Sequence, residues 1–140
     1  TGARLAAEWL LEFGYSSAQI DAIGHCIRSH KGKAETPHSL EAKILYDADV
    51  LEKAGAVYLI LGGKVICEFD ETIPHYLSRE VVDRAREVSC GFYTKMGQTL
   101  DNGRLERTRV LLEEVQAEIQ AERADIQLDE SALWAGNPPQ

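Results

Sequence analysis

The sequence predicts an all-α protein, a bundle of about five or six helices. Apolar residues recur at helical spacings of three, four and seven over most of the chain. One stretch, residues 64–70, alternates like a strand but has no partner strand with which to form a sheet. A chain of 140 residues with 44% hydrophobic residues has the size and composition of one domain. We expect a helical domain over residues 1–128 and a mobile tail over residues 129–140.

Two helices are expected before residue 31. Residues 3–13 carry an apolar stripe, and Gly14 is placed to end this first helix. Ser16 and Gln19 have the spacing of a capping box and begin a second helix that reaches His30. The stripe of the first helix consists of Leu5, Ala6, Trp9, Leu10 and Phe13, and that of the second of Ile20, Ile23 and Ile27.

The middle of the chain predicts one further helix, from residue 39 to about residue 55. Residues 56–61 either extend it or form a short apolar piece of their own. The pair Gly62-Gly63 is expected to end that unit. Residues 64–70 are interpreted as an irregular or helical connection.

Two more helices are expected in the second half. The first begins at Ser78 and the second runs from Arg104 to about Ala124, with a break at residues 101–103. The last helix has a clean apolar face opposite glutamates. That face consists of Leu105, Thr108, Leu112, Val115 and Ile119, and the glutamates are Glu114, Glu118 and Glu122.

Composition excludes several classes of partner. The net charge of −8 argues against nucleic acid and against anionic membrane as general electrostatic partners. The longest apolar run, residues 54–61, is far shorter than the roughly 20 residues that span a bilayer. The three cysteines stand at wide spacings, which favours buried free thiols in a reducing compartment over a disulfide framework or a zinc site. We therefore expect a cytoplasmic protein.

His30 is the first candidate for chemistry. It follows Ile20, Ile23 and Ile27 on one helical stripe and is expected to point inward, beside a loop that contains Gly32. Such a histidine can hold a metal or contact a phosphate, and the alternative is a core histidine bonded to a backbone carbonyl. His25 is expected to lie at the surface or behind the site. His38 and His75, in loops near prolines, are given no chemical role.

Asp47 and Asp49 lie in the middle of an apolar helical segment and point in different directions. If both are buried, each needs a compensating cation. Lys43, Arg28 or a metal ion could supply it, and a purely structural ion pair is the alternative.

Lys31 and Lys33 flank Gly32 just after the His30 helix. They could receive an anionic substrate, or they could be solvated loop lysines. Motifs of other chemistries are missing from the sequence: there is no GxxxxGK[ST], no GxSxG and no HExxH.

A long motif, PHSLEAKILYDADVLEKAGA, runs from Pro37 to Ala56 and follows a helix that ends at His30 and a short loop. In this motif and around it, residues 16–61 resemble the second half of the HD-domain metal-dependent phosphohydrolases. The family has a helix that ends in His, a short loop, and then the pattern P-x-(S/T)-L-E-(A/G)-K-I-(L/V)-x-D-A-D-x-L-(D/E)-x-x-G-A, which here runs from Pro37 to Ala56. The later stretch FYTKMGQTL, followed by a terminal helix that carries arginines, is also similar.

The resemblance implies an HD-domain-like helical bundle and the hydrolysis of a phosphoester by metal-activated water. The substrate would be a nucleotide or another phosphorylated small molecule, and the divalent ion could be Mn, Co, Ni, Mg, Fe or Zn. Asp49 corresponds to the downstream metal ligand and His30 to a catalytic histidine near the metal or phosphate. Lys31 and Lys33 would bind substrate. His25 and Asp47 would contact the metal-ligating side chains without contacting the metal themselves.

The chain departs from the family in one respect. The His and the His-Asp pair that name the family are expected upstream of Ala3, and the 140 residues contain no His-Asp dipeptide. One aspartate cannot hold a catalytic metal, which needs about three protein ligands. We expect a chain shortened at its N-terminus and inactive by itself. The alternative is a non-catalytic helical module for dimerisation, as a homodimer, or for ligand sensing.

Overall fold

The computed structural model describes the backbone of residues 2–133 and the side chains of residues 2–123. This part of the chain is all-helical, as predicted, with seven helices and no strand. The helices are α1 (Gly2–Glu12), α2 (Ser17–Ser29), α3 (Leu40–Glu52), α4 (Val57–Glu68), α5 (Ile73–Cys90), α6 (Lys95–Asp101) and α7 (Arg104–Leu133).

Local capping signals position the ends of the early helices. Gly14 has a φ of 78° just after α1, which is the left-handed conformation that favours glycine. Ser16 and Gln19 form both halves of the predicted capping box at the start of α2. The side chain of Ser39 accepts a hydrogen bond from the backbone N–H of Ala42 and begins α3.

The middle helices differ from the prediction. Gly62 and Gly63 lie inside α4, so the expected end of the unit there is wrong. The helix continues to Glu68, which confirms the helical alternative for most of residues 64–70. Helix α5 begins at Ile73, five residues before the predicted Ser78, with a proline in its first turn.

The break before the last helix is confirmed. Asn102 is left-handed, with a φ of 46°, and Gly103 has a φ of 73°. The seven-residue helix α6, just before this break, was not predicted. Helix α7 reaches Leu133, so the predicted end at Ala124 is wrong and the first five residues of the predicted tail are helical. Residues 134–140 of that tail lie outside the described residues.

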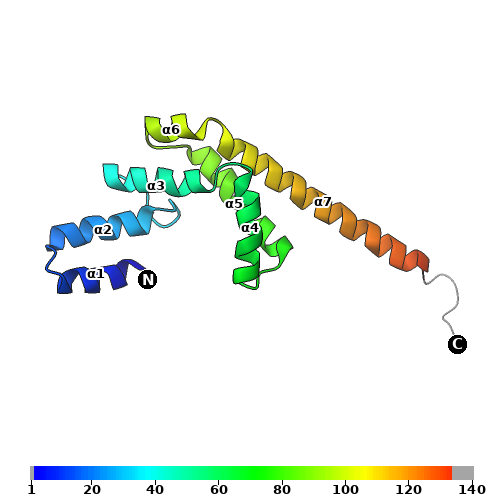
Figure 1. Cartoon of the computed structure of the whole chain (residues 1–140), viewed down its shortest axis with the longest axis horizontal. Coiled ribbons are helices and arrows are strands. Elements are labelled where there is room, and N and C mark those ends of the chain that lie inside the picture. The colour runs from blue at the N-terminus through cyan, green and yellow to red at the C-terminus, as the bar shows by residue number, and fades with distance from the viewer. Residues whose placement is uncertain (1, 134–140) are drawn as a thin grey trace.

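The helices are arranged in a layered but open way (Figure 1). Helices α1, α2 and α3 stack one on the next, α6 packs on α3, and α7 packs against α5 and α4. The second half of α7 extends beyond the other helices. Two apolar clusters form the core. One joins Tyr46, Val50 and Ala54 to Leu105, and the other joins Tyr76 and Leu77 to Leu112.

The apolar face of α1 is only partly covered: α1 packs against α2, and Ala6 and Leu10 are half-buried. The helix forms as predicted, but none of its residues is buried. Trp9 is 63% exposed and Phe13, just after the helix, is 79% exposed. By contrast, the predicted inner face of α7 is buried or half-buried, and its three glutamates are exposed.

Gly62 is required where α4 meets α5. A Cβ added there would lie 2.3 Å from Tyr76 Oη and 2.8 Å from Tyr76 Cζ, and Tyr76 is buried. We expect Gly62→Ala to lower the free energy of unfolding by about 1–3 kcal/mol, because the displaced ring has little room to move. Gly63→Ala is the matched control. Its Cβ meets nothing within 4 Å, so we expect it to stabilise the protein by about 0.5–1 kcal/mol. Urea unfolding followed by circular dichroism measures both, and equal effects would contradict the packing account.

Two expectations from composition can be compared with the structure. None of the seven helices within residues 2–133 combines the length and apolar character needed to cross a bilayer. The three cysteines are free thiols, as expected. Their predicted burial is wrong, because Cys26 is half-buried and Cys67 and Cys90 are exposed.

Candidate anion-binding site

A polar cavity of about 170 Å³ lies where α5 meets the loop after α2, the end of α3 and the start of α4. Six of its lining residues are cationic and three are anionic, so its formal charge is positive although the chain as a whole carries −8. The lining residues are Lys31, Lys33, Lys53, Tyr58, Arg79, Glu80, Asp83, Arg84, Arg86 and Glu87. A small cavity with this excess of cations favours anions.

Arg84 is the least exposed of these cations, with 2% of its side chain accessible. Its Nε lies 2.9 Å from Glu87 Oε2, and its Nη2 donates a hydrogen bond of 3.1 Å to Glu87 Oε1. The second neighbouring carboxylate, that of Glu80, lies 3.7 Å away. Arg84 Nη1 is buried and has no hydrogen-bond partner among the side chains that the structure describes. A buried donor without a partner is costly, and an oxyanion would supply the missing acceptor.

Arg86 also has buried guanidinium nitrogens without a hydrogen-bond partner in the described part of the chain. Its Nη1 donates to the backbone carbonyl of Lys31 at 2.9 Å, which holds the loop after α2 against α5. Its Nε and Nη2 are buried and make no hydrogen bond within residues 2–123. Two neighbouring guanidinium groups therefore both retain donors that protein groups do not satisfy.

The anionic side chains differ in how strongly they hold their charge. Burial raises the pKa of the Glu87 carboxyl, and the nearby charges of Arg84, Lys53 and Arg86 offset this only in part. Burial acts in the same direction on Asp83 and is the largest single influence there. The hydrogen bond from Lys33 and the charges of Lys33, Arg86 and Arg84 together outweigh it and lower the pKa of Asp83. Burial also raises the pKa of the Tyr58 phenol, which donates to Glu80 at 2.9 Å.

The two predicted substrate-binding lysines both line this cavity. Lys33 Nζ lies 2.6 Å from Asp83 Oδ1 on α5, although 50 residues separate them in sequence. Lys31 is brought to the cavity by the bond from Arg86 to its carbonyl. The structure thus brings both lysines to one place, while their role in substrate binding stays a prediction.

Asp49 does not line this cavity, but it pairs with Lys53, which does. Its carboxylate forms an ion pair with Lys53, one helical turn later, and the side chain is 19% exposed. Lys53 Nζ also lies 3.9 Å from Glu87. Asp49 is therefore turned towards a cation, as expected, but that cation is neither Lys43 nor Arg28. Its role as a metal ligand stays a prediction.

His30 is half-buried at the end of α2. Its Nδ1 lies 2.7 Å from the carbonyl oxygen of Ile27, as in the alternative of a histidine bonded to backbone. A carbonyl only accepts, so this bond places the proton on Nδ1 and leaves the lone pair of Nε2 available. His30 does not line the cavity.

Asp47 is buried and holds the start of α6 through hydrogen bonds. It is 3% exposed and accepts hydrogen bonds from the backbone N–H groups of Tyr93 and Thr94, both at 2.8 Å, and from the Thr94 hydroxyl at 2.6 Å. The expectation that Asp47 needs a cation if buried is therefore wrong, because backbone donors at the start of α6 satisfy it. Its position behind a metal ligand is untested.

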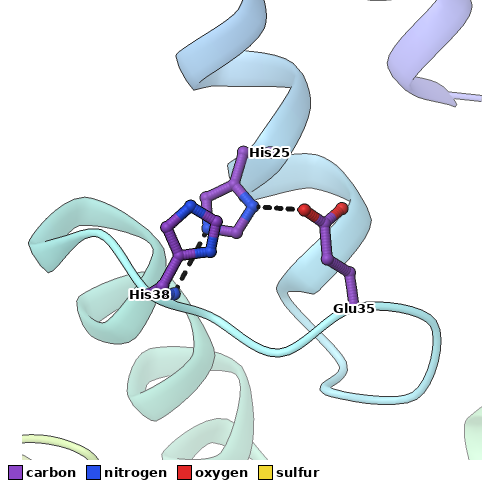
Figure 2. A group of neighbouring side chains, drawn as sticks. All are labelled: His25, Glu35 and His38. Carbon is purple, nitrogen blue, oxygen red and sulfur yellow. Dashed lines mark hydrogen bonds and ion pairs between the residues drawn. The ribbon is translucent and has the colours of Figure 1, made fainter.

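His25 belongs to a separate cluster (Figure 2). It is 6% exposed, so the expectation of a surface position is wrong. Its Nδ1 contacts Glu35 Oε1 at 2.8 Å, and its Nε2 accepts from the backbone N–H of His38 at 3.3 Å. The two imidazole rings lie against each other with centroids 3.7 Å apart. The structure brings His25 to His38, to which the sequence assigned no chemical role.

Sequence reasoning missed eight of the ten residues that line the cavity, namely Lys53, Tyr58, Arg79, Glu80, Asp83, Arg84, Arg86 and Glu87. A signal was present. Glu80, Arg84 and Glu87 stand at i, i+4 and i+7, a spacing that places opposite charges on one face of a helix. Such a face is usually solvated, and the sequence alone does not show that this one is buried.

Comparison of the chain with protein-family models, with curated proteins and with solved structures found no match. The chemistry of the cavity is therefore the main guide to function. Buried, partly unpaired guanidinium groups recognise planar or tetrahedral oxyanions, especially phosphate and carboxylate groups.

Proposed function

We propose that this chain provides the phosphate-binding part of a metal-dependent phosphohydrolase of the HD superfamily. The observation that supports it is that Lys31, Lys33 and Asp49, singled out from sequence, lie in or beside one cavity with an excess of cations. The substrate is a phosphorylated small molecule such as a nucleotide. We place the enzyme in the cytoplasm, which agrees with its free thiols.

The size of the cavity limits what enters it. Sites that enclose a whole small molecule have volumes of about 300–1,000 Å³, and this cavity has about 170 Å³. The phosphoryl group would occupy the cavity, with the rest of the substrate outside. Arg84 and Arg86 would donate hydrogen bonds to its oxygens, and Lys31 and Lys33 would balance its charge.

The residues present do not fit a complete catalytic metal site. Asp49 is one carboxylate and is already paired with Lys53. It does not belong to any group of three metal-ligating side chains among the described residues. A catalytic metal needs about three protein ligands, so the His and His-Asp ligands of the family must come from outside these 140 residues. The residues of this chain support phosphate binding. Hydrolysis of the phosphoester is implied only by the resemblance to the family.

Binding of phosphate tests the proposal directly. We expect orthophosphate and nucleoside monophosphates to bind the chain saturably in isothermal titration calorimetry. Arg86→Gln should weaken binding at least about tenfold, because it removes charged donors from the cavity. Arg107→Gln, an exposed arginine of α7 that does not line the cavity, makes the same change in net charge and should leave affinity within about twofold. Equal losses for both variants would mean that the site lies elsewhere.

A turnover assay separates the proposal from its alternative. With Mn²⁺, Co²⁺ or Ni²⁺ added, this chain alone should bind phosphomonoesters without hydrolysing them. Turnover by the 140 residues would show that the missing ligands are wrongly placed. The alternative is tested with a chain that also contains the family's His and His-Asp ligands. If that chain binds phosphate, does not bind metal and does not hydrolyse substrate, the protein is a non-catalytic ligand-sensing module.

A further inference from the structure

A second polar cluster lies away from the cavity, where the loop between α2 and α3 folds back on α2. It contains His25 of α2 and two loop residues, Glu35 and His38 (Figure 2). Their ligating atoms all lie within 4.8 Å of one another. No other group of three such side chains with this spacing occurs among the described residues.

The three side chains are suited to a metal ion in different ways. His25 is buried and fixed by the helix, whereas His38 is exposed and leaves one side of the cluster open to solvent. Glu35 is held in position by two partners, His25 at one carboxylate oxygen and Arg28 at the other. Arg28 Nε contacts the second oxygen, Oε2, at 2.7 Å and leaves Oε1 towards the histidines. An outer partner of this kind orients a ligating carboxylate.

We propose that His25, Glu35 and His38 bind one divalent ion of the zinc type, separately from the anion-binding cavity. Two imidazoles and a carboxylate are a donor set for Zn²⁺, Co²⁺, Ni²⁺ or Cu²⁺, whereas Mg²⁺ and Ca²⁺ prefer oxygen ligands. Three protein ligands leave a fourth position for water on the exposed side.

The present hydrogen bonds show what binding must change. The His38 N–H donates to His25 Nε2, so the imidazole proton of His25 is on Nδ1, facing Glu35 Oε1. An ion between Nδ1 and Oε1 takes the place of this proton, which moves to Nε2. His25 stays neutral. The ion replaces the 2.8 Å hydrogen bond between Nδ1 and Glu35 Oε1 with two coordination bonds, and the 3.3 Å hydrogen bond from the His38 N–H is lost because Nε2 now carries the proton. Coordination by the His38 ring compensates for that loss.

Binding would also fix the loop that follows α2. This loop carries Lys31 and Lys33 as well as Glu35 and His38, and its other contacts include the ion pair of Lys33 with Asp83, the bond from Arg86 to the Lys31 carbonyl and the ion pair of Glu35 with Arg28. An ion joining two points of the loop to α2 stabilises the folded state by mass action.

The test is a metal titration of the metal-free chain without a polyhistidine tag. We expect Co²⁺ to bind with one-to-one stoichiometry, to give visible absorption of a histidine-ligated ion, and to raise the melting temperature. Zn²⁺ should compete for the site and Mg²⁺ should not. His38→Ala should weaken Co²⁺ binding about 100-fold. This variant should still fold, since its ring is exposed.

His75→Ala is the matched control. His75 also pairs with a glutamate, Glu71, through Nδ1 at 2.6 Å, but it has no third ligand. It should leave Co²⁺ affinity within about twofold. Absence of saturable Co²⁺ binding would overturn the proposal, and so would binding that His38→Ala leaves unchanged. Because orthophosphate binding is measured without metal, failure here leaves the anion-binding cavity untouched.

Discussion

Asp47→Ala should lower the free energy of unfolding by about 3 kcal/mol, among the largest effects expected of any single substitution. The carboxylate is buried and accepts three hydrogen bonds at the start of α6. Its removal leaves two backbone N–H groups without an acceptor and frees α6 from α3. Urea unfolding followed by circular dichroism measures the change.

Two further variants make that result specific. Asp21→Ala removes an exposed aspartate of α2 and should change stability by less than about 0.5 kcal/mol. Asp47→Asn keeps the shape but turns one acceptor oxygen into a donor, so it should recover only part of the loss. An Asp47→Ala variant as stable as Asp21→Ala would contradict the structural role of this carboxylate.

Arg84→Met should lower stability by about 3–5 kcal/mol and abolish phosphate binding. It leaves the carboxylates of Glu80 and Glu87 buried without their central cation, and removing one partner of a buried pair costs that much. Replacing both partners by apolar residues is often neutral. We therefore expect Arg84→Met with Glu87→Leu to recover most of the stability while phosphate binding stays lost. Recovery of binding in this double variant would show that Arg84 does not contact the anion.

The loss of stability caused by Arg84→Met should depend on pH. The pKa of Glu87 is raised in the folded protein, so the folded state holds this proton more tightly than the unfolded state. The ionised Glu87 carboxylate therefore lowers the free energy of unfolding at pH values above its folded-state pKa. This destabilisation disappears as the pH falls towards the pKa of the same carboxyl in the unfolded state. Without Arg84 the pKa of Glu87 rises further, because an opposing charge is gone. The stability difference between Arg84→Met and the parent should therefore shrink as the solution is acidified.

What could be predicted from sequence depended on the range of the interactions. The capping box of Ser16 and Gln19 joins residues three apart, and it was predicted correctly. Gly62 and Gly63 favour a helix end by propensity, yet α4 passes through them, and at Gly62 the missing side chain leaves the space that Tyr76 occupies. Helix α6 was missed because its start depends on Asp47, 47 residues before Thr94.

In the candidate site, too, short-range features could be predicted from sequence and long-range contacts could not. Lys31 and Lys33 were found because they follow a helix end, and the pair of Asp49 with Lys53 is readable as an i, i+4 spacing. The contact of Arg86 with the Lys31 carbonyl, in the loop after α2, joins residues 55 apart and is a tertiary contact that no local pattern reports. The pairing of His25 with His38 likewise depends on how the loop between α2 and α3 folds back.

We propose that the cavity lined by Arg84 and Arg86 holds a phosphoryl group. Anomalous diffraction from crystals soaked in tungstate, a heavy tetrahedral analogue of phosphate, tests it most directly. We expect a tungsten peak in the cavity, placed so that the tungstate oxygens accept hydrogen bonds from both guanidinium groups, and we expect added orthophosphate to displace it. Tungsten bound only at other surfaces, with an empty cavity, would contradict the account.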